Sequence, residues 1–227
     1  MRFLLLGALV LGALTVAPSA GATNECRGLN PCVPVAGPWV VVPAGRAVPR
    51  PQAQYQLTCP RGFVAAGIDA ELSDQAIDLA FIGASGTPVS PGVTTSRSIV
   101  FVASYVGERP RAPTFRPHIG CIPTTGGGTR TPTAVRAVTP PGHPTTRRVV
   151  TERIRGESTV DTTCRADERL VGWYLARGFG TPTPPSPALV SSLRTKTSVS
   201  RNAVSVVARA GRGQGIVQVG AICAGGR

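Results

Sequence analysis

The chain has 227 residues, of which 42% are hydrophobic, and its 24 Lys and Arg against 11 Asp and Glu give a formal net charge of +13. This hydrophobic content excludes an intrinsically disordered chain, and 27 glycines and 22 prolines among many Val and Thr residues argue against long helices. We therefore expect an all-β globular protein with a basic surface.

The N-terminus has the pattern of a secretory signal peptide. A positively charged start and an apolar run over residues 3–17 precede Pro18 and small residues up to Ala22. The run is shorter than the roughly 20 residues that span a bilayer, and the residues before Cys26 are not the small apolar ones of a lipoprotein. We predict cleavage after Ala22 and a secreted, extracellular chain of residues 23–227 with no transmembrane segment.

Six cysteines in an exported chain predict disulfides, because oxidised pairs persist outside the reducing cytosol. They are Cys26, Cys32, Cys59, Cys121, Cys164 and Cys223. The first two flank an Asn-Pro turn, and the separations of Cys59 from Cys121 and of Cys164 from Cys223 are nearly equal. We predict these three pairings. Neither a metal nor a cofactor is expected, because the CxxC pairs and histidine partners of zinc sites are missing from the sequence.

A first unit of strands is predicted over residues 39–123, after a disulfide-looped segment at residues 23–38. Tyr55 and Leu57 alternate with polar residues, which is the period-two pattern of a half-buried strand that ends at Cys59. The predicted strands cover residues 39–45, 55–59, 63–72, 75–83, 97–107 and 118–122, with a Gly/Pro-rich loop at residues 83–92.

A second unit over residues 147–227 repeats this order. "TCPRGFVAAG" (58–67) matches "TCRADERLVG" (163–172), so that Thr, Cys and a Gly recur at an offset of 105. The predicted strands cover residues 147–156, 158–164, 169–178, 201–211 and 216–225, with a Pro-rich loop at residues 180–187. Residues 124–146, rich in Gly, Pro and Thr, form the predicted connector.

One sheet of four or five strands would expose an apolar face, so each sheet must fold over itself or pack on a partner. We expect an antiparallel β-sandwich-like fold built from two related cysteine-anchored repeats. Each long disulfide then ties the first and last strands of its unit. Two small domains and one pseudo-symmetric domain both fit this pattern.

The sequence offers little that is typical of catalysis. Its two histidines are His118, beside a cysteine-bearing strand, and His143, in a proline-flanked loop; neither setting is typical of a general base. Ser85 lies in "GASG", which is not the G-x-S-x-G motif of a nucleophilic serine. We therefore favour a protein that is not an enzyme.

Acidic residues gather in a segment, residues 62–96, that contains no Arg or Lys. They are Asp69, Glu71, Asp74 and Asp78. The cluster could hold a cation through oxygen ligands or supply the carboxylate pair of a glycoside hydrolase, although a solvated turn is the simplest interpretation. Tyr174 and Ala176 occupy the positions of Asp69 and Glu71 in the second unit, so an acidic site would exist only in the first.

Arginine-rich and aromatic residues suggest binding surfaces. Residues 108–117 present Arg109, Arg111 and Arg116 from an extended, proline-rich segment, and guanidinium groups bind phosphate or carboxylate in a fork geometry. The aromatic residues Trp39, Trp173 and Tyr174 could stack on carbohydrate. The low aromatic content, and the match of Trp173 to Ile68 in the first unit, favour core positions instead.

These observations favour a secreted, non-enzymatic binding or structural protein of the cell envelope or exterior. Its net charge predicts polyanionic envelope polymer as the main partner, and nucleic acid is not expected outside the cell. Two alternatives are a secreted hydrolase or cation-dependent carbohydrate-active protein that uses the acids of residues 69–78, and an adhesive module with protein partners.

Overall fold

The computed structural model describes residues 23–45, 49–83, 97–107, 112–123 and 145–225. The predicted signal peptide, most of the predicted loop at residues 83–92 and nearly all of the predicted connector lie outside these residues. Below, residues 23–123 are the first half and residues 145–225 the second half. The described residues confirm the all-β class, and none of their helices is long and apolar enough to span a membrane.

The described strands of the first half are short. They are β1 (Val33–Ala36), β2 (Trp39–Val41), β3 (Gln52–Thr58), β4 (Phe63–Leu72), β5 (Ile77–Gly83), β6 (Ser98–Tyr105) and β7 (Thr114–Pro123). The predicted strand at residues 63–72 coincides with β4, and β3 buries Tyr55 and Leu57 as its alternation predicts. Strand β2 ends just before Pro43, which has no N–H to donate to a sheet.

The strands of the second half are longer than predicted. They are β8 (Thr145–Thr163), β9 (Glu168–Phe179), β10 (Leu193–Val199) and β11 (Ala203–Gly225), with helix α1 (Pro187–Ser192) before β10. The predicted breaks near residues 157 and 213 are bends inside β8 and β11, at Gly156 (φ 84°) and Gly213 (φ 68°). Glycine adopts the positive φ angles of these bends without a steric penalty. Strands β8 and β11 pair with each other on both sides of the bend.

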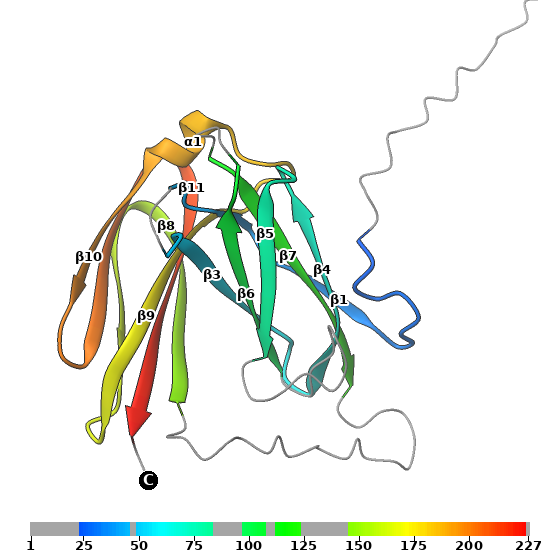
Figure 1. The fold of residues 1–227 in the computed structure, drawn as a ribbon, viewed down its shortest axis with the longest axis horizontal. Helices are drawn as coiled ribbons and strands as arrows, with labels where there is room; N and C mark the ends of the chain where they lie inside the picture. Colours follow the sequence, from blue (N-terminus) through cyan, green and yellow to red (C-terminus); the bar gives the residue numbers. More distant parts are fainter. Residues whose placement is uncertain (1–22, 46–48, 84–96, 108–111, 124–144, 226–227) are drawn as a thin grey trace, which may run out of the picture.

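The strands form two antiparallel sheets (Figure 1). The eight-stranded sheet has the order β1-β7-β2-β9-β11-β10, with β4 also paired to β7 and β8 to β11, and the smaller sheet has the order β3-β6-β5. In β2, Val40 pairs with Phe115 of β7 on one edge and with Gly178 of β9 on the other. One hydrogen-bonded sheet therefore continues through both halves of the chain.

Among the described residues, two large hydrophobic cores pack against this sheet, and a small third one surrounds the Cys164–Cys223 disulfide. In the first, Phe101 of the small sheet lies with Phe115 and Ile119 of the large sheet. In the second, Val206 of β11, before the bend, lies with Val219 of the same strand, after the bend. The bend thus allows one long strand to contribute to both sides of the second core.

The three predicted disulfides, 26–32, 59–121 and 164–223, are all present. Those that close long loops connect residues 62 and 59 positions apart, joining the end of β3 to β7 and the end of β8 to β11. In the chain-entropy model each contributes roughly 4 kcal/mol to stability by restricting the unfolded chain. Three disulfides fit an oxidising compartment.

A buried amide joins the two halves at the seam between β3 and β11. The Nε2 of Gln218, a residue that is 2% exposed, donates to the carbonyl oxygen of Gln56 at 3.0 Å and to the Thr151 hydroxyl at 2.9 Å. Its Oε1 accepts from the Gln56 N–H at 2.6 Å. Beside it, Arg147 lies 5.6 Å from the centre of the Tyr174 ring. The seam is therefore a specific polar contact between apolar cores.

Candidate functional site

The four acidic residues of the predicted cluster do not converge on one site. Asp69 and Glu71 lie on β4 of the large sheet, whereas Asp78 is exposed on β5 of the small sheet. Asp74 lies in the turn between β4 and β5, where its Oδ2 accepts a hydrogen bond from the Tyr105 hydroxyl at 3.2 Å. The structure therefore groups only Asp69 and Glu71.

Asp69 contacts the N-terminal segment directly, and Glu71 contacts it through His118. The N–H of Asn24 donates to Asp69 Oδ2 at 2.6 Å, and the ring of His118 lies 2.8 Å from Glu71 Oε1 through Nε2. The other ring nitrogen of His118 lies 3.9 Å from Glu25 Oε1, and both His118 and Glu25 are buried. These contacts fit a structural role, because the two carboxylates already have protein partners instead of facing a substrate.

The described residues contain one grouping with the proximity of metal ligands, formed by Cys164, Glu168 and Cys223. Its two cysteines are joined to each other in a disulfide. Glu168 is bound by Arg148, whose Nη2 donates to Glu168 Oε1 at 2.7 Å, and by the N–H of Arg165. These two hydrogen bonds lower the pKa of Glu168. The disulfide and the Arg148–Glu168 pair together link β8, β9 and β11, which is a structural role.

The predicted arginine site is only partly described. Arg109 and Arg111 lie outside the described residues, as do Ser85 and His143. Arg116 has internal partners: its Nη1 lies 3.6 Å from Glu71 Oε1, and its Nε donates to the carbonyl oxygen of Gly37 at 3.2 Å. Its guanidinium group is therefore used mainly to hold the fold.

Positive charge is concentrated in the second half of the chain. The described residues of the first half hold five basic and five acidic residues, whereas those of the second half hold twelve basic and five acidic residues. The basic residues of the second half are Arg147, Arg148, Arg153, Arg155, Arg165, Arg169, Arg177, Arg194, Lys196, Arg201, Arg209 and Arg212. The electrostatic potential of the described residues is therefore most positive over this half.

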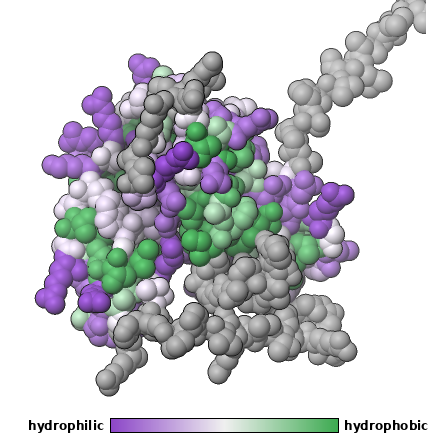
Figure 2. Space-filling view, in the orientation of Figure 1, coloured by the Kyte–Doolittle hydropathy of each residue, from purple (hydrophilic) through white to green (hydrophobic). Residues whose placement is uncertain are grey.

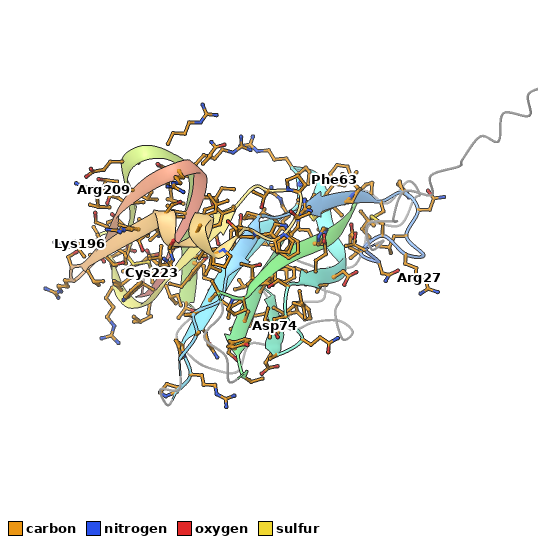
Figure 3. All side chains as sticks on the ribbon, turned by 90° about the horizontal axis from the view of Figure 1, so that it is seen from above. Arg27, Phe63, Asp74, Lys196, Arg209 and Cys223 are labelled. Carbon is orange, nitrogen blue, oxygen red and sulfur yellow. A yellow bond between two sulfur atoms is a disulfide. The ribbon has the colours of Figure 1, made fainter. Side chains whose placement is uncertain are left out.

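Four of these residues, Arg194, Lys196, Arg209 and Arg212, lie close together on β10 and β11 and are called the basic face. Arg194 of β10 stands directly opposite Arg209 of β11, and Lys196 lies two residues further along β10 and therefore on the same side. Figure 3 shows Lys196 and Arg209 at one end of the molecule and Arg27 at the other. Arg194, Arg209 and Arg212 line an open hollow of about 470 Å³.

Like charges that stand directly opposite each other on paired strands destabilise a sheet. The pair of Arg194 and Arg209 therefore carries a cost, which Glu157 offsets in part through an ion pair of 2.6 Å with Arg209. That ion pair is exposed on both sides, and exposed pairs contribute little to stability. The basic face is thus an arrangement that folding alone does not favour.

The two tryptophans have different environments. Trp39 is 3% exposed and belongs to the core, as predicted, but Trp173 is 45% exposed, so the core interpretation of Trp173 is wrong. The reason is its place at the end of the second core, where Val199, the last residue of β10, is also 47% exposed. Leu170 and Leu175 of β9 pack partly against the second core, whereas Trp173 between them belongs to no core cluster of the described residues.

Buried phenols line the seam near Gln218. Burial raises the pKa of Tyr55 and the pKa of Tyr174 to about 12 each. The charge of the nearby Arg147 lowers the pKa of Tyr174, but by less than burial raises it. Both phenols are therefore neutral at physiological pH and act as packing groups.

Comparisons with protein-family models, with curated proteins and with solved structures found no match to this chain. Function is therefore inferred from the charge and geometry of the described residues. Sequence reasoning missed the basic face, although its signal is the alternation of Arg194 and Lys196 in "LRTKTSV", which places both side chains on one face once this segment is taken as a strand.

Proposed function

We propose that the protein is a secreted, non-enzymatic binding protein for anionic polymer of the cell envelope or exterior, and that the basic face is its main contact surface. The observation that carries this proposal is the direct opposition of Arg194 and Arg209 on paired strands. Such a like-charge pair lowers the stability of the folded protein by a few tenths of a kcal/mol or more. A bound anion removes this repulsion, so the arrangement suits a ligand.

We also propose that the chain is a sandwich-like structure of two related units, in which corresponding strands pair in the same order. Thr58 of β3 pairs with Ser98 of β6, and Thr163 of β8 pairs with Ala203 of β11, an offset of 105 for both partners. Strands β4 and β9 each contain one residue that has no partner on the neighbouring strand. In β4 it lies between Ala65 and Gly67, and in β9 between Leu170 and Gly172, so the two unpaired positions are again 105 apart. These registers support a duplicated origin.

The basic face distinguishes the second unit from the first under this plan. The positions that match Arg194 and Arg209 are Asp78 and Ser104, which stand opposite each other on β5 and β6. The first unit therefore has an acidic and a neutral side chain where the second unit has two cations. This difference supports a binding role that belongs to the second unit alone.

The basic face contains two kinds of cation that suit a polymer. Arginine forks bind phosphate or carboxylate groups with two parallel hydrogen bonds, whereas Lys196 attracts anions as a point charge. The open hollow beside Arg212 has space for one anionic group of the polymer, with neighbouring groups held along β10. Binding of this kind is weakened by salt.

The test is retention of oxidised residues 23–227 on purified cell envelope, from low salt to about 0.5 M, where screening acts within a few ångströms. The triple variant Arg194→Ser/Lys196→Ser/Arg209→Ser is expected to lose retention at low salt by roughly tenfold or more, since exposed charge contacts contribute up to about 1 kcal/mol each. The matched control is Arg27→Ser/Arg50→Ser/Arg61→Ser, which removes the same charge from the first half and is expected to retain most binding.

Two outcomes contradict parts of this proposal. Absence of retention at every salt concentration rules out an anionic envelope polymer as the partner. Equal losses in the two triple variants preserve a role for net charge but reject the basic face as the main contact.

A further inference from the structure

An exposed aromatic ring lies beside a cation on the second half of the chain. A hollow of about 630 Å³ lies between the start of β9 and the turn that joins β10 to β11. Its lining includes Leu170, Val171, Trp173, Val199, Ser200 and Arg201, and it is called the Trp173 groove. Strands β9 and β10 both pair with β11, but along different segments of that strand, and the start of β9 and the turn from β10 to β11 lie at the same end of the molecule (Figure 1).

The apolar side chains of the Trp173 groove are unusually open to solvent. Val171 is 48% exposed, Trp173 is 45% exposed and Val199 is 47% exposed. Apolar residues also gather visibly in patches on the molecular surface (Figure 2). A contiguous patch of large apolar side chains rimmed by polar groups is typical of an interaction site, because a ligand that covers it removes apolar area from water.

Arg201 gives the groove its charge. Its side chain is exposed and has no acidic partner within ion-pair distance among the described residues. Arg201 also lines an adjoining hollow of about 410 Å³ together with Arg169. Asp167 and Glu168 lie in that second hollow, but Glu168 is already neutralised by Arg148. Arg201 therefore lines both hollows, and its guanidinium group is available to an anion.

We propose that the Trp173 groove binds one acidic sugar residue of a polysaccharide, with the Trp173 ring stacked on the sugar ring and Arg201 paired with its carboxylate. This inference rests on the proposed function and deepens it, because it identifies the anionic polymer as an acidic polysaccharide. A flat aromatic ring gains most from a ligand that also has a ring face, and a guanidinium fork matches a carboxylate.

Other polyanions fit the groove less well. A poly(glycerol phosphate) chain has charge but no ring to lie on Trp173. Single-stranded nucleic acid is bound by series of aromatic side chains along a basic groove, whereas Tyr174 and Phe179, the other aromatic residues described in the second half, are buried. A sugar ring with one carboxylate matches Trp173, the one exposed aromatic ring among the described residues of the second half, and Arg201 beside it.

The Trp173 groove and the basic face lie on opposite sides of β10. Arg194 and Lys196 of the basic face lie in the first part of the strand, and Val199 at its end lines the groove. Side chains alternate between the two sides of a strand, so Val199, three residues after Lys196, points away from the basic face. The groove is therefore a contact separate from the basic face, and recognition of the sugar depends on Trp173 and Arg201.

Tryptophan fluorescence provides the test, because the chain has only two tryptophans and Trp39 is buried. The oxidised chain is titrated with an oligogalacturonate, with a neutral oligosaccharide of equal length and with poly(glycerol phosphate), while acrylamide quenching is measured. We expect the oligogalacturonate alone to shift the Trp173 emission to shorter wavelength and to protect this residue from quenching. Titration calorimetry, which does not depend on the Trp173 signal, measures the variants: Trp173→Ala and Arg201→Gln should each weaken binding roughly tenfold, and Trp173→Phe should retain most of the affinity.

Arg50→Gln, which removes a charge from the first half, is the matched control for Arg201→Gln and should bind like the wild type. Equal protection of Trp173 by the neutral oligosaccharide overturns the role of Arg201. Salt-sensitive binding of the acidic polymers without protection of Trp173 overturns the groove proposal but leaves the proposed function standing. Failure of every anionic polymer to bind overturns both.

Discussion

Tyr55 and Tyr174 show at the level of single residues how burial changes the chemistry of a side chain. Both lie at the seam between the halves, and burial raises the pKa of each phenol to about 12. A phenol in the unfolded chain has a pKa near 10. The folded state therefore favours the neutral phenol.

Stability is accordingly expected to fall in alkali. Because each pKa is higher in the folded state, the stabilisation is complete below about pH 10 and is lost as the pH rises to about 12. A shift of two pKa units corresponds to about 3 kcal/mol for each phenol. Urea unfolding at a series of pH values from 9 to 11.5 measures this loss, and Tyr55→Phe/Tyr174→Phe should flatten it. Ionisation of all three tyrosines near pH 10 in the folded protein would contradict it.

The N-terminal segment is positioned by the close approach of its backbone to strands β4 and β7. The carbonyl oxygen of Glu25 packs against Gly67 of β4 and Gly120 of β7, and a Cβ at either glycine would overlap this oxygen. His118 and Asp69 then bind the segment through side chains. Small residues on two paired strands thus create the space in which the segment lies.

Gly67→Ala is therefore expected to displace the N-terminal segment. The overlap with the backbone should lower the free energy of unfolding by about 1–3 kcal/mol. It should also speed hydrogen exchange at the amide of Asn24, which donates to Asp69. The control is Gly172→Ala, at the matching position of β9, where a Cβ meets only the flexible side chain of Ile222. Equal destabilisation by the two substitutions, without faster exchange at Asn24, would show that the segment is not held by this contact.

Over the whole molecule, the two halves are coupled through a shared sheet and a buried amide. Strand β2 pairs with β7 of the first half and β9 of the second half. Gln218 satisfies the N–H and the carbonyl oxygen of Gln56 across the seam. These connections make the halves depend on each other although each has its own core and long disulfide.

Thermal unfolding of the oxidised chain is therefore expected to be a single cooperative transition. Gln218→Leu should lower stability by roughly 3 kcal/mol, because it leaves the buried polar groups of Gln56 without partners, and should separate the unfolding of the halves. Calorimetry tests both expectations through the ratio of calorimetric to van 't Hoff enthalpy. Two transitions in the wild-type protein would mean that the halves unfold independently.

The sequence by itself determined the all-β class, the three disulfide pairings and most strands of the first half. It did so through two local signals: the alternation around Tyr55 and the nearly equal spacing of the long cysteine pairs. These signals act within a few residues or through a covalent bond, so they can be read along the chain.

Only the tertiary structure decided that β8 and β11 continue through their bends, because Gly156 and Gly213 resemble turn residues unless a paired strand accompanies them. Strand β10 was missed because its "LRTKTSV" segment has few apolar residues and becomes a strand by pairing with β11. The exposure of Trp173 and the opposition of Arg194 and Arg209 likewise depend on where distant strands end and how they align. Their positions are set by long-range packing and strand register, which a local pattern does not contain.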